Sequence, residues 1–257
     1  MKASAFLPCL LIVLCAAGCA RQEPPAPVAA EPPADPIAAA VADESRPGTA
    51  RVQDSFRRPA EILAFAGVDP GDTVVEIAPG QGYYTALLSR VVGDSGRVVA
   101  IDAERLFEFM PRARENFAAY SAMDPRDNVS YQSQRLDAPE LPGSVDQIWM
   151  VLFYHDTMWL DVDRAAMNRA FFEALKPGGV YLVVDHRGAD GAGLEIARDL
   201  HRAPAPIVRA EIEAAGFVLE AESDLLANPD DPRTDSAFAD ARRGKTDQFV
   251  WKFVKPQ

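Results

Sequence analysis

Cysteine is scarce in this chain of 257 residues, which contains only three. All three, Cys9, Cys15 and Cys19, lie near the amino terminus. The rest of the chain therefore has no thiol that could form a disulfide or act as a nucleophile. Its stability must come from a hydrophobic core, and a chain of this length is long enough to form one.

Basic side chains are outnumbered: 26 lysine and arginine residues stand against 38 aspartate and glutamate residues, a formal net charge of −12. Binding a nucleic acid needs a concentrated basic face, because the protein must neutralise phosphates. The composition therefore argues against a nucleic acid as substrate or partner. Arg51, Arg57 and Arg58 form an early basic cluster, and a solvated helix face accounts for it.

The apolar stretch near the amino terminus, residues 5–14, is too short to span a bilayer as a helix. Lys2 precedes it, and the small residues of Ala16-Ala17-Gly18-Cys19 follow it. This arrangement resembles a bacterial lipoprotein signal, which implies that Cys19 becomes the lipidated amino terminus of the mature protein. Ordinary secretory cleavage nearby and an uncleaved membrane anchor are the alternatives.

This interpretation divides the chain into three parts. Residues 1–18 are a signal peptide, residues 19–45 are a proline- and alanine-rich tether, and residues 46–257 are one globular domain. Six prolines between Pro24 and Pro36 favour a tether that stays extended and builds no core. Ala20 resembles the outer-membrane sorting pattern of enteric bacteria. We therefore expect a periplasm-facing lipoprotein of the bacterial cell envelope, in the outer rather than the inner membrane and held there through its lipid alone.

The domain is organised around a strand, a glycine turn and a helix. Residues 73–77 form an apolar, β-branched run of the kind found in buried parallel strands, and residues 78–82 supply the turn. A helix over 83–92 places backbone N–H groups and a positive dipole end beside this turn. A second strand over 96–101 ends at Asp102, where an acidic group suits the two hydroxyls of a ribose.

Two residues distinguish this unit from a dinucleotide-binding fingerprint. Glu76 is charged although it lies near the end of an apolar strand, and Thr85 replaces the third glycine. The stretch resembles motif I of the class I S-adenosylmethionine-dependent methyltransferases, an acidic residue followed by G-x-G-x-G. The resemblance implies S-adenosylmethionine as cofactor. The residues that it assigns to the cofactor are Glu76, Ala78 (in place of the first glycine), Gly80, Gly82, Asp102 and, near the adenine, Asp137.

Later segments extend the resemblance over the domain. The turn Leu175-Lys176-Pro177-Gly178-Gly179 recurs in this family before the fifth strand, and it is expected to close a helix over 163–175. Other helices are predicted over 54–66, over 104–120 with a break at Pro111, and over 206–215. Further strands are predicted over 129–132, 145–152, 180–184, 217–223 and 248–254, with a polar surface loop over 228–245.

The strand and helix alternation predicts a single α/β domain with a mostly parallel sheet and helices on both faces. By resemblance, this is a Rossmann-like methyltransferase domain whose seven strands follow the order 3-2-1-4-5-7-6, with strand seven antiparallel. The stretches VVDH, LHR and AGF are similar to those of exported, uncharacterised bacterial proteins predicted to be methyltransferases.

The three histidines lie at or after the ends of two predicted strands. His155 follows the fourth strand, His186 follows the fifth, and His201 lies in the next segment; Asp156 and Asp185 stand beside the first two. Ligands of open α/β sheets bind beyond the carboxyl ends of the strands. We therefore predict that His155, Asp156, Asp185 and His186 form the catalytic group, with an imidazole as general base and no metal. A divalent metal site that includes His201 and a purely structural role are the alternatives.

Three functions fit these observations. The first is an S-adenosylmethionine-dependent methyltransferase acting on a small-molecule or envelope acceptor. The second is an exported ligand-binding protein on the same scaffold, because fold does not determine function and the cofactor is made in the cytoplasm. The third, a nucleotide-dependent oxidoreductase, is disfavoured by Glu76, Thr85 and the LKPGG turn.

Lipidation can be tested directly. The Cys19→Ser variant should incorporate no labelled palmitate and should accumulate as unprocessed precursor, whereas the wild-type protein should be labelled and cleaved. Wild-type protein that also takes up no label would show that the signal is not a lipoprotein signal, although secretion could still occur.

Overall fold

The computed structural model describes Met1 and residues 35–257. The predicted signal peptide, the lipidation site at Cys19 and the first part of the tether lie outside the described residues. Within the described part of the chain, no helix combines the length and the apolar character needed to cross a membrane.

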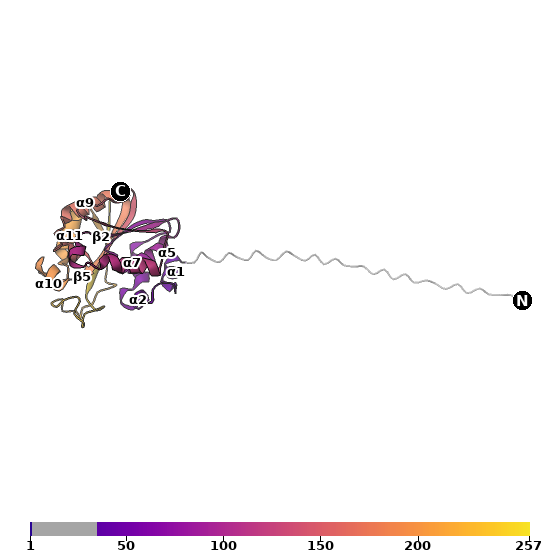
Figure 1. Ribbon diagram of the computed structural model, residues 1–257, viewed down its shortest axis with the longest axis horizontal. Coiled ribbons are helices and arrows are strands. Elements are labelled where there is room, and N and C mark those ends of the chain that lie inside the picture. Colours follow the sequence, from indigo (N-terminus) through magenta and orange to yellow (C-terminus); the bar gives the residue numbers. More distant parts are fainter. Residues whose placement is uncertain (2–34) are drawn as a thin grey trace. The chain divides into compact units, whose positions relative to one another are not determined.

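A seven-stranded sheet forms the centre of the domain, and its order β3-β2-β1-β4-β5-β7-β6 confirms the predicted topology. Figure 1 shows the folded domain, with strands β2 and β5 labelled among the helices. Neighbouring strands are parallel except that β7 runs antiparallel to both β5 and β6. The strands are β1 (Thr73–Ile77), β2 (Arg97–Ala103), β3 (Val129–Gln134), β4 (Val145–Val151), β5 (Leu175–His186), β6 (Val218–Ser223) and β7 (Gln248–Val254).

Both faces of the sheet are covered by helices, which explains why its strands read as continuous apolar runs. Val74 and Val75 are neighbours on β1, both are fully buried, and they belong to two different hydrophobic clusters. The cluster around Val74 takes side chains from α4 (Pro59–Ala66) and α5 (Tyr83–Val92). The cluster around Val75 takes them from α9 (Arg164–Ala174) and α11 (Ala205–Ala214).

Prolines set several helix boundaries. The helix predicted over 54–66 is two helices, α3 (Asp54–Arg57) and α4, because Arg58 adopts a left-handed φ of 46° before Pro59 starts the second. A proline suits the first turn of a helix and disfavours helical conformation in the preceding residue. The predicted break at Pro111 is confirmed by α6 (Leu106–Phe109) and α7 (Ala113–Met123).

The LKPGG segment follows the end of α9 (Arg164–Ala174), which confirms that it closes a helix, but it is not a separate turn. Instead of a turn between a helix and a later strand, β5 already begins at Leu175 and runs for 12 residues. Val145 of β4 pairs with Leu175 and Gln147 pairs with Val180, so the segment forms a bulge against β4. Gly178 occupies the left-handed region there, with φ 78°, which glycine adopts without strain. The short helices α2 (Gly48–Arg51), α8 (Tyr154–Thr157) and α10 (Glu195–Leu200) are not predicted from the sequence.

The domain begins earlier than predicted. Residues 36–42, assigned above to an extended tether, form helix α1 (Pro36–Ala42), which Asp35 caps by accepting a hydrogen bond from the backbone N–H of Ile37. Ala40 is buried in the cluster with α4 and α5. The Arg90 guanidinium on α5 then pairs with Asp43 at 2.6 Å and with Asp124 at 2.7 Å. A proline at the start of a helix, followed by alanines, favours helix here over the extended form.

Truncation at the two alternative boundaries should separate these interpretations. A chain of residues 46–257 should be less stable than one of residues 35–257 by about 1–3 kcal/mol, because it loses the apolar contacts of α1 and one partner of Arg90. Urea denaturation followed by circular dichroism measures the difference. The Asp43→Ala variant of the longer chain isolates the contribution of the ion pair, and equal stability of the two truncated chains would contradict the docking of α1.

Candidate active site

Glu76 lies at the end of β1 and is almost completely buried, with 5% of its surface exposed. Thr85, on the first turn of α5, donates a hydrogen bond of 2.5 Å from Oγ1 to Glu76 Oε2. Burial raises the pKa of Glu76 to about 7, although the bond from Thr85 opposes the shift. The threonine that replaces the third glycine of the fingerprint therefore holds the acidic residue in place. Positive charge beside Glu76 would favour its ionised form.

The turn after β1 has three residues with positive φ: Ala78 at 55°, Gly80 at 59° and Gly82 at 74°. The backbone N–H of Ala78 donates to the carbonyl of Ile101 on β2, which fixes the start of the turn. No atom lies within 4 Å of a Cβ built on Gly80, whereas one built on Gly82 would overlap the ring of Tyr120. Gly80 therefore leaves space for a ligand, and Gly82 allows α5 to pack against α7. This differs from the prediction that both glycines serve ligand approach.

Asp102 ends β2, is 1% exposed, and accepts a hydrogen bond of 2.7 Å from the Tyr131 hydroxyl at its Oδ2. Burial raises the pKa of Asp102. Its Oδ1 is buried and has no hydrogen-bond partner in the described part of the chain. An unpaired buried carboxylate oxygen costs free energy until a donor reaches it, so this atom suits a ligand hydroxyl.

Asp137 lies in the loop after β3, where it pairs with Arg135 at 2.7 Å. The Arg135 hydrogen bond lowers the pKa of Asp137. Together with Ala103 and Glu104, Asp137 lines a cavity of about 600 Å³ beyond the end of β2. Within the described part of the chain, this cavity shares no lining residue with the cavity at the glycine turn, which is described next.

Two further cavities share one wall. The first, of about 450 Å³, is lined by Glu76 and residues 77–81, and the second, of about 760 Å³, lies beside it. The residues that line both are Gln53, Arg57, Tyr84, Val151, Leu152, His186, Phe238 and Arg243. The glycine turn and the larger cavity are thus neighbouring parts of one site. Arg57, Phe238 and Arg243 are site residues that the sequence analysis missed, because nothing in their spacing points to a ligand.

The structure brings the four residues of the predicted catalytic group together, but of the four only His186 lines the two cavities. His186 lines both cavities, and its Nδ1 lies 2.7 Å from the Thr246 hydroxyl. Burial lowers the pKa of His186 to about 4, so its imidazole is neutral at neutral pH. His155 lines neither cavity, although its ring centre lies 6.0 Å from that of His186; it also lies 5.6 Å from the ring of His201 and borders Asp156 and Asp185. Of the described histidines, only His186 faces the cofactor turn as predicted.

His155 and Asp185 form a buried pair. His155 Nδ1 lies 2.7 Å from Asp185 Oδ1, and the backbone N–H of His155 donates to Asp185 Oδ2 at 2.9 Å. Burial alone would lower the pKa of His155, but the charge and hydrogen bond of Asp185 outweigh it and raise the value. Asp185 therefore acts on the orientation of His155.

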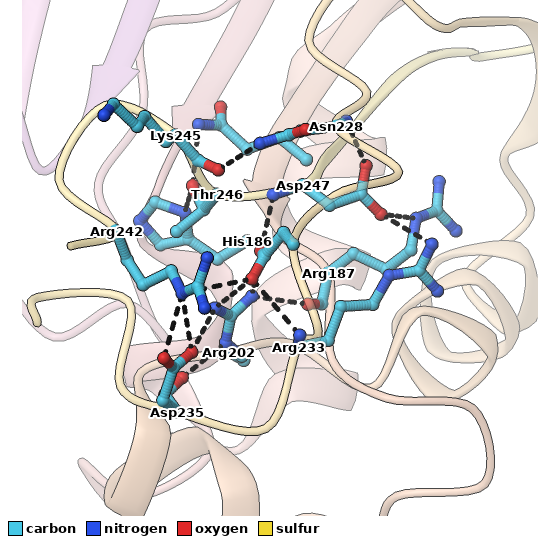
Figure 2. Close-up of polar contacts among 12 residues, drawn as sticks. His186, Arg187, Arg202, Asn228, Arg233, Asp235, Arg242, Lys245, Thr246 and Asp247 are labelled. Atoms are coloured by element: carbon cyan, nitrogen blue, oxygen red, sulfur yellow. Dashed lines mark hydrogen bonds and ion pairs between the residues drawn. The ribbon is translucent and has the colours of Figure 1, made fainter.

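The segment between β6 and β7, predicted as a polar surface loop, is held by buried charges. Arg202 is fully buried and pairs with Asp231 at 2.8 Å, and it donates to the carbonyls of Arg187 and Asp235. Figure 2 shows Arg202 between Asp235 on one side and Asp247 on the other. The segment carries Phe238 and Arg243, so this cluster fixes one wall of the site. The LHR stretch, residues 200–202, supplies Arg202 to this cluster, and no local sequence pattern indicates that role.

Comparison with known proteins agrees with this geometry. The family model of protein-L-isoaspartate (D-aspartate) O-methyltransferase matches residues 54–134, which contain the glycine turn, Asp102 and Tyr131. A ubiquinone/menaquinone biosynthesis C-methyltransferase UbiE from Teredinibacter turnerae is 34% identical over 142 residues, covering 54% of this chain and 53% of that protein. The chain thus spans about half the length of the curated relatives it matches.

Solved structures share the fold over most of the domain. The structure of a SAM-dependent methyltransferase from Aquifex aeolicus matches with a TM-score of 0.56 and 18% identity, covering 79% of this chain and 98% of that one. The domain therefore has the fold of this S-adenosylmethionine-dependent methyltransferase. The [4+2]-cyclase SpnF also matches, with a TM-score of 0.55 and 15% identity over 79% of this chain and 82% of that one. Proteins named for different chemistry thus share this fold, so the fold alone does not establish the reaction.

Replacing the two glycines of the turn after β1, Gly80 and Gly82, should lower the free energy of unfolding by different amounts. Gly82→Ala should lower the free energy of unfolding by about 2–4 kcal/mol, since it combines a strained φ with overlap of the Tyr120 ring. Gly80→Ala introduces only the strained φ, without overlap, and should lower the free energy of unfolding by about 1 kcal/mol. Urea denaturation measures both losses, and adding Tyr120→Ala to Gly82→Ala should recover the part that comes from overlap. Equal losses in the two glycine variants would show that Tyr120 does not constrain the turn.

Proposed function

We propose that this protein is an S-adenosylmethionine-dependent methyltransferase that acts on a small, largely apolar acceptor. The observation that carries the proposal is the shared wall between the cavity at the glycine turn and the larger cavity beside it. Methyl transfer needs a cofactor and an acceptor held in contact, since its rate depends chiefly on positioning the two reactants. Matches to methyltransferases in sequence and fold support the same conclusion.

The residues at the strand ends fit the cofactor. The free Oδ1 of Asp102 would accept a hydrogen bond from a ribose hydroxyl, and the cavity with Asp137 would take the adenine. Gly80 leaves the backbone open to the methionine portion, while Glu76 lies at the end of β1, where its carboxylate would offset positive charge. When bound, the cofactor supplies an electrophilic methyl group on a sulfonium.

The larger cavity indicates the class of acceptor. Its lining includes Phe56, Tyr84, Leu226 and Phe238, which suit an apolar or aromatic body. Arg57, Arg243 and Lys245 line it as well and would hold an acidic or anionic group of the same molecule. The matched relatives are named as C-methyltransferases of ubiquinone and menaquinone biosynthesis, which is consistent with an acceptor of this kind.

His186 is the proposed general base. Its ring lines both cavities, and burial keeps it neutral, which leaves a lone pair to accept a proton from the acceptor. The same lowering of its pKa, to about 4, makes it a weaker base than a free imidazole. The Thr246 hydroxyl fixes the orientation of the ring through Nδ1. His155 and Asp185 are outside this step, which revises the predicted catalytic group.

We also propose that the domain acts in the bacterial cell envelope as an outer-membrane lipoprotein anchored through Cys19. The support is the amino-terminal sequence, with Lys2, the apolar stretch over 5–14 and the small residues before Cys19. An acceptor of the envelope would fit both this location and the apolar cavity.

Titration calorimetry of the purified protein tests the cofactor assignment. S-Adenosylmethionine and S-adenosylhomocysteine should bind and NAD should not. Asp102→Ala should weaken binding by about tenfold or more, because a charge-assisted hydrogen bond contributes about 1.5–3 kcal/mol. Asp127→Ala, an exposed aspartate in the loop before β3, is the control and should bind as wild type does. Binding of NAD in place of S-adenosylmethionine would overturn the proposal, and cofactor binding without transfer to any acceptor would leave a binding protein.

The same titration repeated across pH examines Glu76. A protonated Glu76 must lose its proton to meet a cationic ligand, and its pKa is raised to about 7. Affinity should therefore rise by about tenfold between about pH 6 and pH 8. Glu76→Gln should remove this dependence.

A further inference from the structure

Three metal-ligating side chains converge outside the proposed transfer site. They are His155 and Asp156 at the start of α8, and His201 directly after α10, where the backbone takes a left-handed φ of 50°. One ligand atom from each lies within 4.8 Å of the other two. Because α8 and α10 pack against each other, residues far apart in the sequence meet here.

Two ring nitrogens in this cluster are buried and have no hydrogen-bond partner within the described residues: His155 Nε2 and His201 Nδ1. Each lies 3.4 Å from Asp156 Oδ1. This is long for a charge-assisted hydrogen bond, which is normally about 2.7–2.9 Å. It matches the separation of about 3.3–3.4 Å expected between two ligands of a tetrahedral ion whose bonds are about 2.0–2.1 Å. The spacing therefore suits a shared metal ion better than direct pairing.

The surroundings of His155 orient it as a ligand. Asp185 is fully buried and accepts hydrogen bonds from the backbone N–H groups of His155 and His186, so it is an acceptor at this site. The proton between Asp185 and His155 then belongs to Nδ1, which leaves the lone pair of Nε2 directed away from Asp185. A carboxylate that fixes the tautomer in this way is the usual partner of a metal-bound histidine.

Asp156 is oriented as well. The Trp159 indole N–H donates to Asp156 Oδ1 at 2.9 Å, which limits rotation of the carboxylate. The side chains of Asp156 and His201 are 14% and 28% exposed, so an ion can reach the cluster from solvent. The ring of Phe238, which lines the larger cavity, packs 4.6 Å from that of His201. The cluster is thus next to the acceptor cavity.

We propose that His155 Nε2, the Asp156 carboxylate and His201 Nδ1 bind one divalent transition-metal ion. Two imidazoles and one carboxylate, without cysteine, suit Zn²⁺ and also Co²⁺ or Fe²⁺. Three protein ligands leave a coordination position for water or for an oxygen of a bound molecule. The site does not require S-adenosylmethionine, so this proposal stands or falls separately from methyl transfer.

The test is a titration of the purified, chelator-treated full-length protein with Co²⁺ and with Zn²⁺. Co²⁺ should bind with a stoichiometry of one and give the visible absorption bands of a tetrahedral site, and Zn²⁺ should displace it. Either ion should raise the thermal midpoint of unfolding, because it binds only the folded state. Asp156→Asn and His201→Ala should each weaken binding by about 100-fold or more, beyond the 10–100-fold loss typical of outer-shell changes.

Asp199→Asn is the matched control, since it removes an exposed carboxylate on α10 that is outside the proposed ligand set, and it should bind Co²⁺ as wild type does. Circular dichroism confirms that each variant is folded, and the partly exposed His201 is the variant least able to disturb the core. Binding that persists unchanged in Asp156→Asn and His201→Ala would overturn the site. Absence of binding by the wild-type protein would also overturn it.

Discussion

The buried carboxylate of Asp185 links the end of strand β5 to the start of helix α8. It lies near the end of β5, is completely buried, and receives two backbone N–H groups and the His155 ring. An isolated carboxylate would be very costly there, so its three partners must stay in place. They belong to the first turn of α8 and to β5 itself. Through these hydrogen bonds the Asp185 carboxylate fixes His155 and the first turn of α8 against the end of β5.

Around that anchor, adjacent residues serve different purposes. His155 turns toward Asp156 and His201, whereas His186 borders the cavities at the cofactor turn. His201 faces His155 and Asp156, while the next residue, Arg202, is buried and pairs with Asp231. His155 and His186 meet at the Asp185 carboxylate, and His201 and Arg202 are adjacent in the sequence. The two members of each pair nevertheless face different environments, so one end of the sheet borders both the cavities and a second polar cluster.

The sheet order was predictable because it depends on local signals that repeat: buried apolar strands, a glycine turn and helices between them. Thr73–Ile77 and the turn after it carry most of that information. The site was less predictable, because it depends on contacts between distant segments. Arg202 meets Asp231 across 29 positions, and Gly82 is constrained by a tyrosine on another helix. Periodicity gives the face on which a residue lies, but it does not say which loop will cover that face. The predicted end of the tether at residue 45 was wrong because the alanines after Pro36 favour a helix, although the prolines before it disfavour one.

The position of β7 has a consequence for the order in which the fold can form. Strand β6 joins the sheet only through β7, which lies between it and β5. The first five strands can pair as the chain emerges, but β6 must wait until β7 is available. The segment between them, with Phe238 and Arg243, is anchored by Arg202 and by groups next to β7. Pairing across such sequence distances is slow, because the loop must close before contacts form. The glycine turn after β1 can therefore be in place before the wall formed by Phe238 and Arg243 is assembled, so an incompletely folded chain would have the turn without the complete larger cavity.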